Sequence, residues 1–393
     1  MHPHLSTWMG GTRFIYEVSR RLKKRCDIEI IVETISPDLR EKFENEGIRV
    51  TEVSDLSTYS MKYWAFFPLY LRKTLKNCEE KITKGKFDVL IASFFPMNWV
   101  VTQFNVMSIY LCFEPFPWFH DPFMINSFPF FKRQLLKFAK VLYLNYDLDG
   151  TKKVKEIITL SEFTKSMIKR IYGREAHVCR EGVDLEHFKR RVCPELSRKY
   201  SGYKIILHIA SFLPHSKFNP ITRTDLLIRA LPIVASRIRN VKLLIIKKID
   251  NVNARKVIEK LASDLGVLDR IEFLPFVDEK LLPCYYSLAD VFVQPTQNQS
   301  ANLPVKEAMA CETPVVAFRG DGTEEDIGKD GECGFLVPPL SVDQLALKII
   351  QILENPSMAK KMGKKGRERV EKLFSWEKVT NNIWEIINRN MKE

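Results

Sequence analysis

The sequence predicts an α/β protein built from two Rossmann-like halves, each a parallel sheet flanked by helices. Short apolar runs typical of buried parallel strands alternate with helical patterns along most of the 393 residues. The alternation breaks in one place, at about 188–201, where charged residues and prolines replace it. The length also suits two domains, each large enough to enclose a core of its own.

In the first half, apolar runs predict strands at 28–32, 48–53, 89–93, 108–112 and 157–160. Helical patterns lie at 12–25, 63–84, 132–145 and 162–172, the last of these capped by Ser161 and closed by Gly173. The chain reaches the turn at Gly10-Gly11 after only a few residues, whereas a doubly wound domain needs a strand before it. We therefore expect the first strand to be missing, or Met1 to be an internal start.

The second half repeats the pattern. Strands are predicted at 205–210, 241–246, 271–273, 291–293 and 315–318, and helices at 223–238, 253–266, 305–311 and 375–391. Pro304 falls in the first turn of a helix, where its missing N–H would have had no partner.

A net charge of +13 favours anionic partners such as phosphates, nucleic acid or an acidic membrane surface. The chain carries no nucleic-acid recognition motif, so we expect no nucleic-acid partner. Its eight cysteines are scattered without a Cys-x-x-Cys pair, which favours buried thiols in a reducing cytosol over disulfides or zinc. The long uncharged run 89–113 includes Pro96, Asn98 and Gln103, and is better interpreted as strand, loop, helix and strand than as a transmembrane helix.

The segment 289–339 is the most informative part of the chain. It combines a buried strand, a polar loop, a helix, a second buried strand and a glycine-rich turn. Such a unit directs a helix N-terminus, with free N–H groups and a partial positive charge, toward the space beyond the sheet. An anion is the natural ligand at this place.

The same segment resembles the nucleotide-sugar site of the GT-B glycosyltransferases of family 4. In that family a Glu is followed, after seven residues, by Glu-Ala-Met-Ala; here the second acid is Glu307 and the position of the first is occupied by Gln299. Two other segments also match the family, Ser161-Glu162-Phe163 and the turn 180–188. The resemblance implies two Rossmann-like domains facing across a cleft: an acceptor-side domain, 1–188, and a donor-binding domain, 189–375. It also implies that a C-terminal helix, 376–393, crosses back to the first domain.

The resemblance assigns roles within the donor site. Glu307 would accept hydrogen bonds from both ribose hydroxyls of the nucleotide. Gln299 lies where relatives contact the transferred sugar, and an amide there keeps the hydrogen-bonding shape but loses the negative charge. Asn302 and Leu303, at the end of the loop, would contact the donor.

Other residues are assigned to the diphosphate of the donor. Gly10 and Gly11 would let backbone N–H groups approach a phosphate or sugar, although a plain turn is the simpler interpretation. The family has an Arg and a Lys after the first strand of its second domain; the Arg is absent here, and Arg223 falls at the Lys position. Lys217 could replace the lost charge, and Lys247 and Lys248 could also reach the phosphates, unless these lysines are only solvated.

Ser161 and His120 are candidates for the acceptor side, with helix capping as the alternative role of Ser161. The stretches 63–70 and 113–131 are rich in aromatic residues and are followed by basic ones, which suits a membrane contact, a lipid-phosphate acceptor or buried packing. Asp147-Leu148-Asp149 has the Asp-x-Asp spacing of a metal-binding GT-A enzyme, but the surrounding residues indicate a helix and we expect no metal.

The resemblance therefore implies a retaining glycosyltransferase that moves a sugar from a nucleotide-diphosphate sugar to a glycan or lipid-linked acceptor, with no cofactor. It would be cytoplasmic, in contact with an anionic membrane at the cytoplasmic face. The alternative is a catalytically degenerate nucleotide-sugar-binding protein, which the Gln at 299 and the missing Arg favour.

Overall fold

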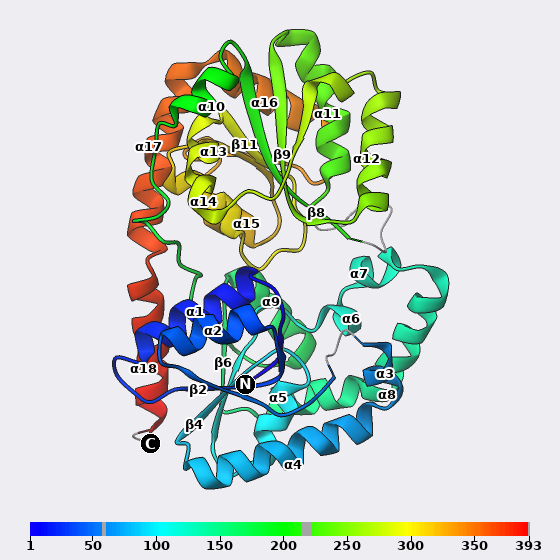
Figure 1. The fold of residues 1–393 in the computed structure, drawn as a ribbon, viewed down its shortest axis with the longest axis vertical. Helices are drawn as coiled ribbons and strands as arrows, with labels where there is room; N and C mark the ends of the chain where they lie inside the picture. Colours follow the sequence, from blue (N-terminus) through cyan, green and yellow to red (C-terminus); the bar gives the residue numbers. More distant parts are fainter. Residues whose placement is uncertain (57–59, 214–221, 392–393) are drawn as a thin grey trace. The chain divides into compact units, whose positions relative to one another are not determined.

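The computed structural model describes residues 1–56, 60–213 and 222–391, which divide into two compact units (Figure 1). Unit 1 contains most of the chain up to Gly182, and unit 2 contains Val183–Ser375 together with the short segment Asn126–Phe130. The last helix, α18 (Trp376–Met391), belongs to unit 1. It packs against α1 (Gly10–Leu22), and Figure 1 shows the two side by side.

Unit 2 is built on a six-stranded sheet with the order β10-β9-β8-β11-β12-β13. All neighbouring pairs are parallel, and the strands are buried along most of their length, which explains their continuous apolar sequences. The strands are β8 (Lys204–Phe212), β9 (Val241–Asp250), β10 (Ile271–Leu274), β11 (Val291–Gln294), β12 (Val315–Phe318) and β13 (Gly334–Val337).

Helices cover both faces of this sheet and enclose two hydrophobic cores (Figure 1). The first core lies under α11 (Thr224–Arg237), α12 (Val252–Asp264) and α16 (Val342–Glu354). The second lies under α13 (Leu282–Leu288), α14 (Leu303–Ala310) and α17 (Pro356–Leu373). Two shorter helices, α10 (Pro194–Lys199) and α15 (Gly322–Ile327), complete the described helices of this unit.

Unit 1 contains a three-stranded sheet, β1-β2-β3, and a four-stranded sheet, β4-β5-β6-β7, both parallel. The strands are β1 (His2–Leu5), β2 (Glu29–Ile35), β3 (Arg49–Glu52), β4 (Val89–Ser93), β5 (Met107–Leu111), β6 (Glu156–Thr159) and β7 (His177–Val178). The run 89–113 forms β4, a short helix and β5, as predicted, and no described helix is long and apolar enough to cross a membrane.

The expectation that the first strand is missing is wrong, because His2–Leu5 forms β1 and pairs with β2. Met1 joins this strand to β4: the Ser93 N–H donates to the Met1 carbonyl at 2.9 Å, and the Met1 amine donates to the Ile91 carbonyl. Along a strand, alternate residues form hydrogen bonds to the same neighbouring strand, so Pro3 would be the next residue after Met1 to donate to β4. Proline has no N–H, and this hydrogen bond therefore cannot form. A four-residue strand containing proline and two histidines gives almost no strand signal in the sequence.

All four long helices predicted in the first half are present, but one of them is divided, and others, such as the helix at 37–45, were not predicted. The predicted helix 63–84 is divided into α3 (Met61–Ala65) and α4 (Phe67–Gly85), because the backbone of Phe66 leaves the helical region and Pro68 starts a new helix. The others are α2 (Pro37–Asn45), α5 (Met97–Val100), α6 (Pro117–His120), α7 (Pro122–Ser127), α8 (Phe130–Lys153) and α9 (Glu162–Tyr172).

The cysteines correct a second expectation. Cys193 and Cys284 form a disulfide, with their Cα atoms 5.8 Å apart, whereas we expected thiols only. The bond joins the start of α10 to α13, two elements that pack together although these cysteines are 91 residues apart in the chain. Sequence spacing could not indicate this pairing. The other six cysteines are free thiols.

Candidate functional site

The candidate donor site of unit 2 lies at the carboxyl ends of β8, β11 and β12, where parallel strands of an α/β sheet usually place ligand-binding loops. The loop after β11 leads to Asn302, which precedes the first residue of α14. Pro304 lies in the first turn of this helix, as predicted. The start of α14 therefore follows directly on the loop that carries Gln299.

Buried acids from the neighbouring segment hold this loop in place. Asp321 accepts a hydrogen bond from the Gln299 N–H at 3.0 Å, and Asp326 accepts one from the Asn302 N–H at 2.7 Å. The Gly322 N–H donates to the Gln299 carbonyl at 2.8 Å, and a Cβ atom on Gly322 would overlap the backbone of the loop. Burial raises the pKa of Asp321 to about 6, although the hydrogen bonds that it accepts from backbone N–H groups oppose this shift.

Lys306 brings a positive charge to the same network. Its side chain is fully buried, with Nζ 3.5 Å from Asp326 Oδ1 and 5.3 Å from the centre of the Phe374 ring. Burial raises the pKa of Asp326, and the Lys306 ammonium opposes that rise. The sequence analysis did not select Lys306 or Asp326. The two residues are twenty positions apart, and nothing in the sequence around either one indicates that they form a pair.

Glu307 is buried in the middle of α14 rather than at its first turn. Its Oε2 accepts a hydrogen bond from the Tyr286 hydroxyl of α13 at 2.8 Å. Tyr286 is itself fully buried and its carbonyl accepts from the Thr313 hydroxyl at 2.6 Å. These contacts fix the position of the carboxylate. That it binds the ribose hydroxyls of a nucleotide stays a prediction.

Arg223 immediately precedes α11, in the left-handed region at φ 44°. Its guanidinium pairs with both carboxylate oxygens of Asp225, at 3.0 and 2.9 Å, and donates to Gln297 at 3.1 Å. These bonds hold it beside the loop that follows β11 and partly neutralise its charge. A phosphate would therefore compete with Asp225 for the same donors, and the phosphate role of Arg223 stays a prediction.

The other predicted phosphate ligands are less informative. Lys217 belongs to the segment 214–221, which is outside the described residues. Lys247 is paired with Asp250 at 2.7 Å near the end of β9.

His208, which the sequence analysis did not select, is fully buried in β8. Its two ring nitrogens bond to the Val293 carbonyl of β11 and to the Thr224 hydroxyl of α11.

In unit 1, Gly10 and Gly11 form the first turn of α1. A Cβ atom on Gly10 would lie 3.7 Å from Glu181 Oε1, and one on Gly11 would lie 3.5 Å from the Phe113 ring. Both are ordinary contacts, and neither glycine has a positive φ. The turn is therefore close to a buried carboxylate from the matched segment 180–188, and its contact with a diphosphate or acceptor stays a prediction.

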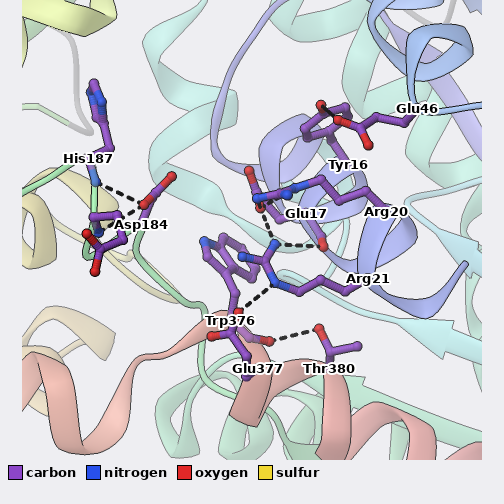
Figure 2. A network of polar contacts seen from close by, with 11 residues as sticks. Tyr16, Glu17, Arg20, Arg21, Glu46, Asp184, His187, Trp376, Glu377 and Thr380 are labelled. Atoms are coloured by element: carbon purple, nitrogen blue, oxygen red, sulfur yellow. Dashed lines mark hydrogen bonds and ion pairs between the residues drawn. The ribbon is translucent and has the colours of Figure 1, made fainter. Parts of the chain in front are cut away.

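The rest of α1 is fixed by the C-terminal helix (Figure 2). Arg21 donates from Nε to Glu377 at 3.2 Å and from NH1 to the Glu17 carbonyl at 3.1 Å, and it also pairs with the Glu17 carboxylate. Its guanidinium lies 5.9 Å from the centre of the Trp376 ring. Through these contacts α18 supports the helix that begins at the glycine turn.

His120 belongs to a buried polar cluster. Its Nε2 lies 2.7 Å from Asp147 Oδ2, which also accepts a hydrogen bond from the Tyr172 hydroxyl at 2.8 Å. Asn98 donates to Asp147 Oδ1 at 2.9 Å. Because a carboxylate oxygen accepts, Nε2 is the nitrogen that donates in this hydrogen bond. Asp147 is therefore the residue that orients His120.

The same cluster argues against a metal site at Asp147-Leu148-Asp149. Asp147 lies inside α8, is completely buried, and its oxygens bond to His120, Tyr172 and Asn98. Asp149 lies on the exposed side of the same helix. The two carboxylates of the Asp-x-Asp sequence therefore face different surroundings, because residues two apart on a helix do not share a face.

Most of the remaining acceptor-side candidates cap a helix or pack into the core of unit 1. The Ser161 hydroxyl accepts from the Thr164 N–H at 3.2 Å and caps α9, as the capping alternative predicted. In the two aromatic stretches, most rings pack into the core of unit 1, including Trp64, Phe67 and Phe119. The exceptions include Phe66, Phe130 and Phe131, which are 56, 60 and 87% exposed.

Comparisons with known proteins agree with this picture. A model of the family "Glycosyltransferase Family 4" matches residues 8–187, and a model of "Glycosyl transferases group 1" matches residues 195–369. The chain is 31% identical over 180 residues to the GDP-mannose-dependent alpha-(1-6)-phosphatidylinositol monomannoside mannosyltransferase of Mycolicibacterium smegmatis, covering 44% of this chain and 46% of that protein. It is 36% identical over 121 residues to the MMP alpha-(1->4)-mannosyltransferase of Mycolicibacterium hassiacum, covering 31% of this chain and 29% of that protein.

Solved structures share the fold across the whole chain. A glycosyltransferase of Rickettsia africae superposes with a TM-score of 0.77 at 19% identity, covering 100% of this chain and 98% of the other. The HepE protein of Anabaena, in complex with UDP, also superposes with a TM-score of 0.77, at 15% identity and 99% coverage of both chains.

The chain spans 46% and 29% of the lengths of these two mannosyltransferases, so their reactions are not carried over to it here. The two family models together account for both units, and the Glu307 segment lies inside the second match. The chain belongs to the family 4, group 1 glycosyltransferases and has their GT-B type of fold.

Proposed function

We propose that this protein is a retaining glycosyltransferase that moves a sugar from a nucleotide-diphosphate sugar to a glycan or lipid-linked acceptor. The observation that carries the proposal is the arrangement in unit 2, where the Gln299 loop, the start of α14 and Glu307 are held by buried partners at the carboxyl ends of the strands. The relatives support the donor class, because their names specify GDP-mannose or mannosyl transfer, and HepE binds UDP.

In this proposal unit 2 binds the donor and unit 1 binds the acceptor. Glu307 binds the ribose, and Gln299 contacts the transferred sugar. The bond between the anomeric carbon and the β-phosphate oxygen breaks, and the acceptor hydroxyl forms a new bond to that carbon on the same face. The departing phosphate takes the hydroxyl proton, and the N–H groups at the start of α14, with Arg223, stabilise its growing charge.

The proposal places the protein on the cytoplasmic side of a membrane, where a lipid-linked acceptor would be available. Six of its eight cysteines are free thiols, which supports a reducing compartment, although the Cys193–Cys284 disulfide does not. No metal or cofactor takes part in the proposed reaction.

A second candidate function is nucleotide-sugar binding without turnover. It is favoured by Gln299, which lacks the charge of the usual Glu, and by Arg223, whose guanidinium is already paired with Asp225. In that case the site would bind its ligand through Glu307 and catalyse no transfer.

The two candidates differ in a direct experiment. Release of nucleoside diphosphate from GDP-mannose, UDP-glucose and other donors is measured for the wild type and for Gln299→Glu. Asn298→Asp is the control for an added charge nearby, because Asn298 is exposed. We expect the wild type to release product, and Gln299→Glu to do so faster. If both are inactive while a nucleotide sugar still binds, the transferase proposal is wrong and the binding protein remains.

A further inference from the structure

Helix α8 carries apolar side chains on two different faces. One face packs into the core of unit 1 through Leu136, Ala139 and Tyr143. A second face, turned away from this core, is also apolar: Leu135, Phe138, Val141 and Leu142 are 39, 61, 79 and 47% exposed. A helix at the surface of a globular protein normally has one apolar stripe and a polar outer face. Core packing therefore does not explain the second apolar stripe.

The exposed residues form a continuous stripe. Leu135, Phe138 and Leu142 are spaced three and four residues apart, so they lie above one another on the same side of the helix. Phe131, four residues before Leu135, is 87% exposed and extends this line by one turn. Figure 1 shows α8 at one side of unit 1.

A second exposed apolar group begins beside α8. The Phe67 ring, in the first turn of α4, lies 4.5 Å from the Tyr143 ring of α8. Next to it, Phe66 and Leu69 are 56 and 63% exposed. The chain then continues with Arg72 and Lys73, so this group also joins apolar side chains to basic ones.

The charge pattern decides what kind of partner fits the stripe. Residues 128–146 contain Lys132, Arg133, Lys137 and Lys140 and no acidic residue. A second copy of this surface would carry the same positive charge, so the pattern disfavours self-association and favours an anionic partner. Exposed aromatic and aliphatic side chains among lysines are typical of a helix that lies in the headgroup region of an anionic bilayer.

We propose that the outer face of α8, formed by Leu135, Phe138, Val141 and Leu142 with Lys137, docks on an anionic lipid bilayer. The aliphatic and aromatic side chains enter the boundary between headgroups and acyl chains, and the lysines contact lipid phosphates. The purpose of this docking rests on the proposed function, because it would bring unit 1 to a lipid-linked acceptor, but the docking itself requires no nucleotide sugar.

Sedimentation of the full chain with vesicles tests the proposal. One set of vesicles is phosphatidylcholine alone, and the other contains about 30% phosphatidylglycerol, which supplies the negative surface potential. The wild type is expected to bind the anionic vesicles and to lose most of this binding at high salt. Phe138→Ser/Leu142→Ser is expected to reduce the partition coefficient about tenfold or more.

Phe276→Ser/Leu281→Ser is the matched control, because Phe276 and Leu281 are 81 and 52% exposed and belong to unit 2 rather than to α8. It should bind like the wild type, and all three proteins should have the same unfolding temperature. The proposal is wrong if the wild type binds neither kind of vesicle, or if the α8 variant binds as well as the control. It is also wrong if the wild type is a dimer that the α8 variant converts to a monomer, since a second copy would then cover the stripe.

Vesicle binding is measured without donor, and donor turnover is measured without vesicles. A negative result in one measurement therefore contradicts only the proposal that it tests and leaves the other proposal unaffected.

Discussion

Replacing Lys306 with methionine tests whether the start of α14 depends on a buried charge pair. The lysine is fully buried, and its Nζ lies 3.5 Å from Asp326 Oδ1. The other oxygen of Asp326 holds the Asn302 N–H at 2.7 Å, just before α14 begins. Methionine has a similar length and no charge, so the variant leaves Asp326 as a buried carboxylate without its cation.

The geometry gives the size of the effect. Two unit charges 3.5 Å apart attract by roughly 5 kcal/mol at an effective dielectric constant of about 20. Removing one member of a buried pair costs about 3–5 kcal/mol in practice. We therefore expect Lys306→Met to lower the free energy of unfolding by about 3 kcal/mol at neutral pH. Lys306→Met/Asp326→Asn should recover most of this loss, because it removes both charges and keeps an acceptor for Asn302.

The pH dependence has a definite sign. Burial already raises the pKa of Asp326, and loss of Lys306 would raise it further. The folded protein would then hold the proton more tightly than the unfolded chain, so the variant loses stability as the pH rises above about 4, the value for unfolded Asp. The deficit should shrink toward pH 4.

Urea unfolding followed by circular dichroism measures these differences. Lys348→Met is the control, because Lys348 is a half-buried lysine of unit 2 that lies over the Phe335 ring and bonds to the neutral Gln351. The reasoning is refuted if Lys306→Met costs less than about 1 kcal/mol, or if the double variant is no more stable than the single one.

Three other predictions follow from buried groups. Burial raises the pKa of Glu33 from 4.5 to about 7, so the wild type should lose up to about 3 kcal/mol of stability as the pH rises from about 4.5 to above 7. Glu33→Gln should show a smaller loss in urea unfolding at pH 5 and pH 8, and equal losses would contradict this. On the proposal that His120 positions the acceptor, Asp147→Asn should lower the turnover number about tenfold, through misorientation of His120, without changing the affinity for the donor; an equal loss of donor affinity would contradict this role. Gly322→Ala should destabilise unit 2 by about 2 kcal/mol or more and weaken donor binding, because its Cβ would overlap the Ser300 carbonyl; unchanged urea unfolding would show that the loop has room.

The sequence predicted those parts of the fold that depend on local pattern. Strands β4, β11 and β12 were found almost to the residue, because parallel strands buried on both faces have uninterrupted apolar sequences. The cap of α9 was found because serine and glycine have well-defined positions at helix ends. Strand β1 was missed because Pro3 and two histidines give no such pattern.

The candidate site was predictable only where a family motif covered it. Glu307 and Gln299 were located by the motif, but their partners Tyr286 and Asp321 lie about twenty residues away on other elements. His120 and Asp147 were both noticed, yet the sequence could not show that they are partners. Contacts between residues far apart in the chain depend on the tertiary fold, and a single sequence holds no signal for them.

The central claim is that unit 2 contains a nucleotide-sugar site in which Glu307 holds the ribose. A thermal-shift measurement with UDP-, GDP-, ADP- and TDP-sugars on the wild type and on Glu307→Gln tests it most directly, because the amide can still accept the hydrogen bond from Tyr286. The account predicts that nucleotide sugars with one particular base raise the unfolding temperature of the wild type and have little effect on that of Glu307→Gln. No shift with any donor, or the same shift in both proteins, would contradict it.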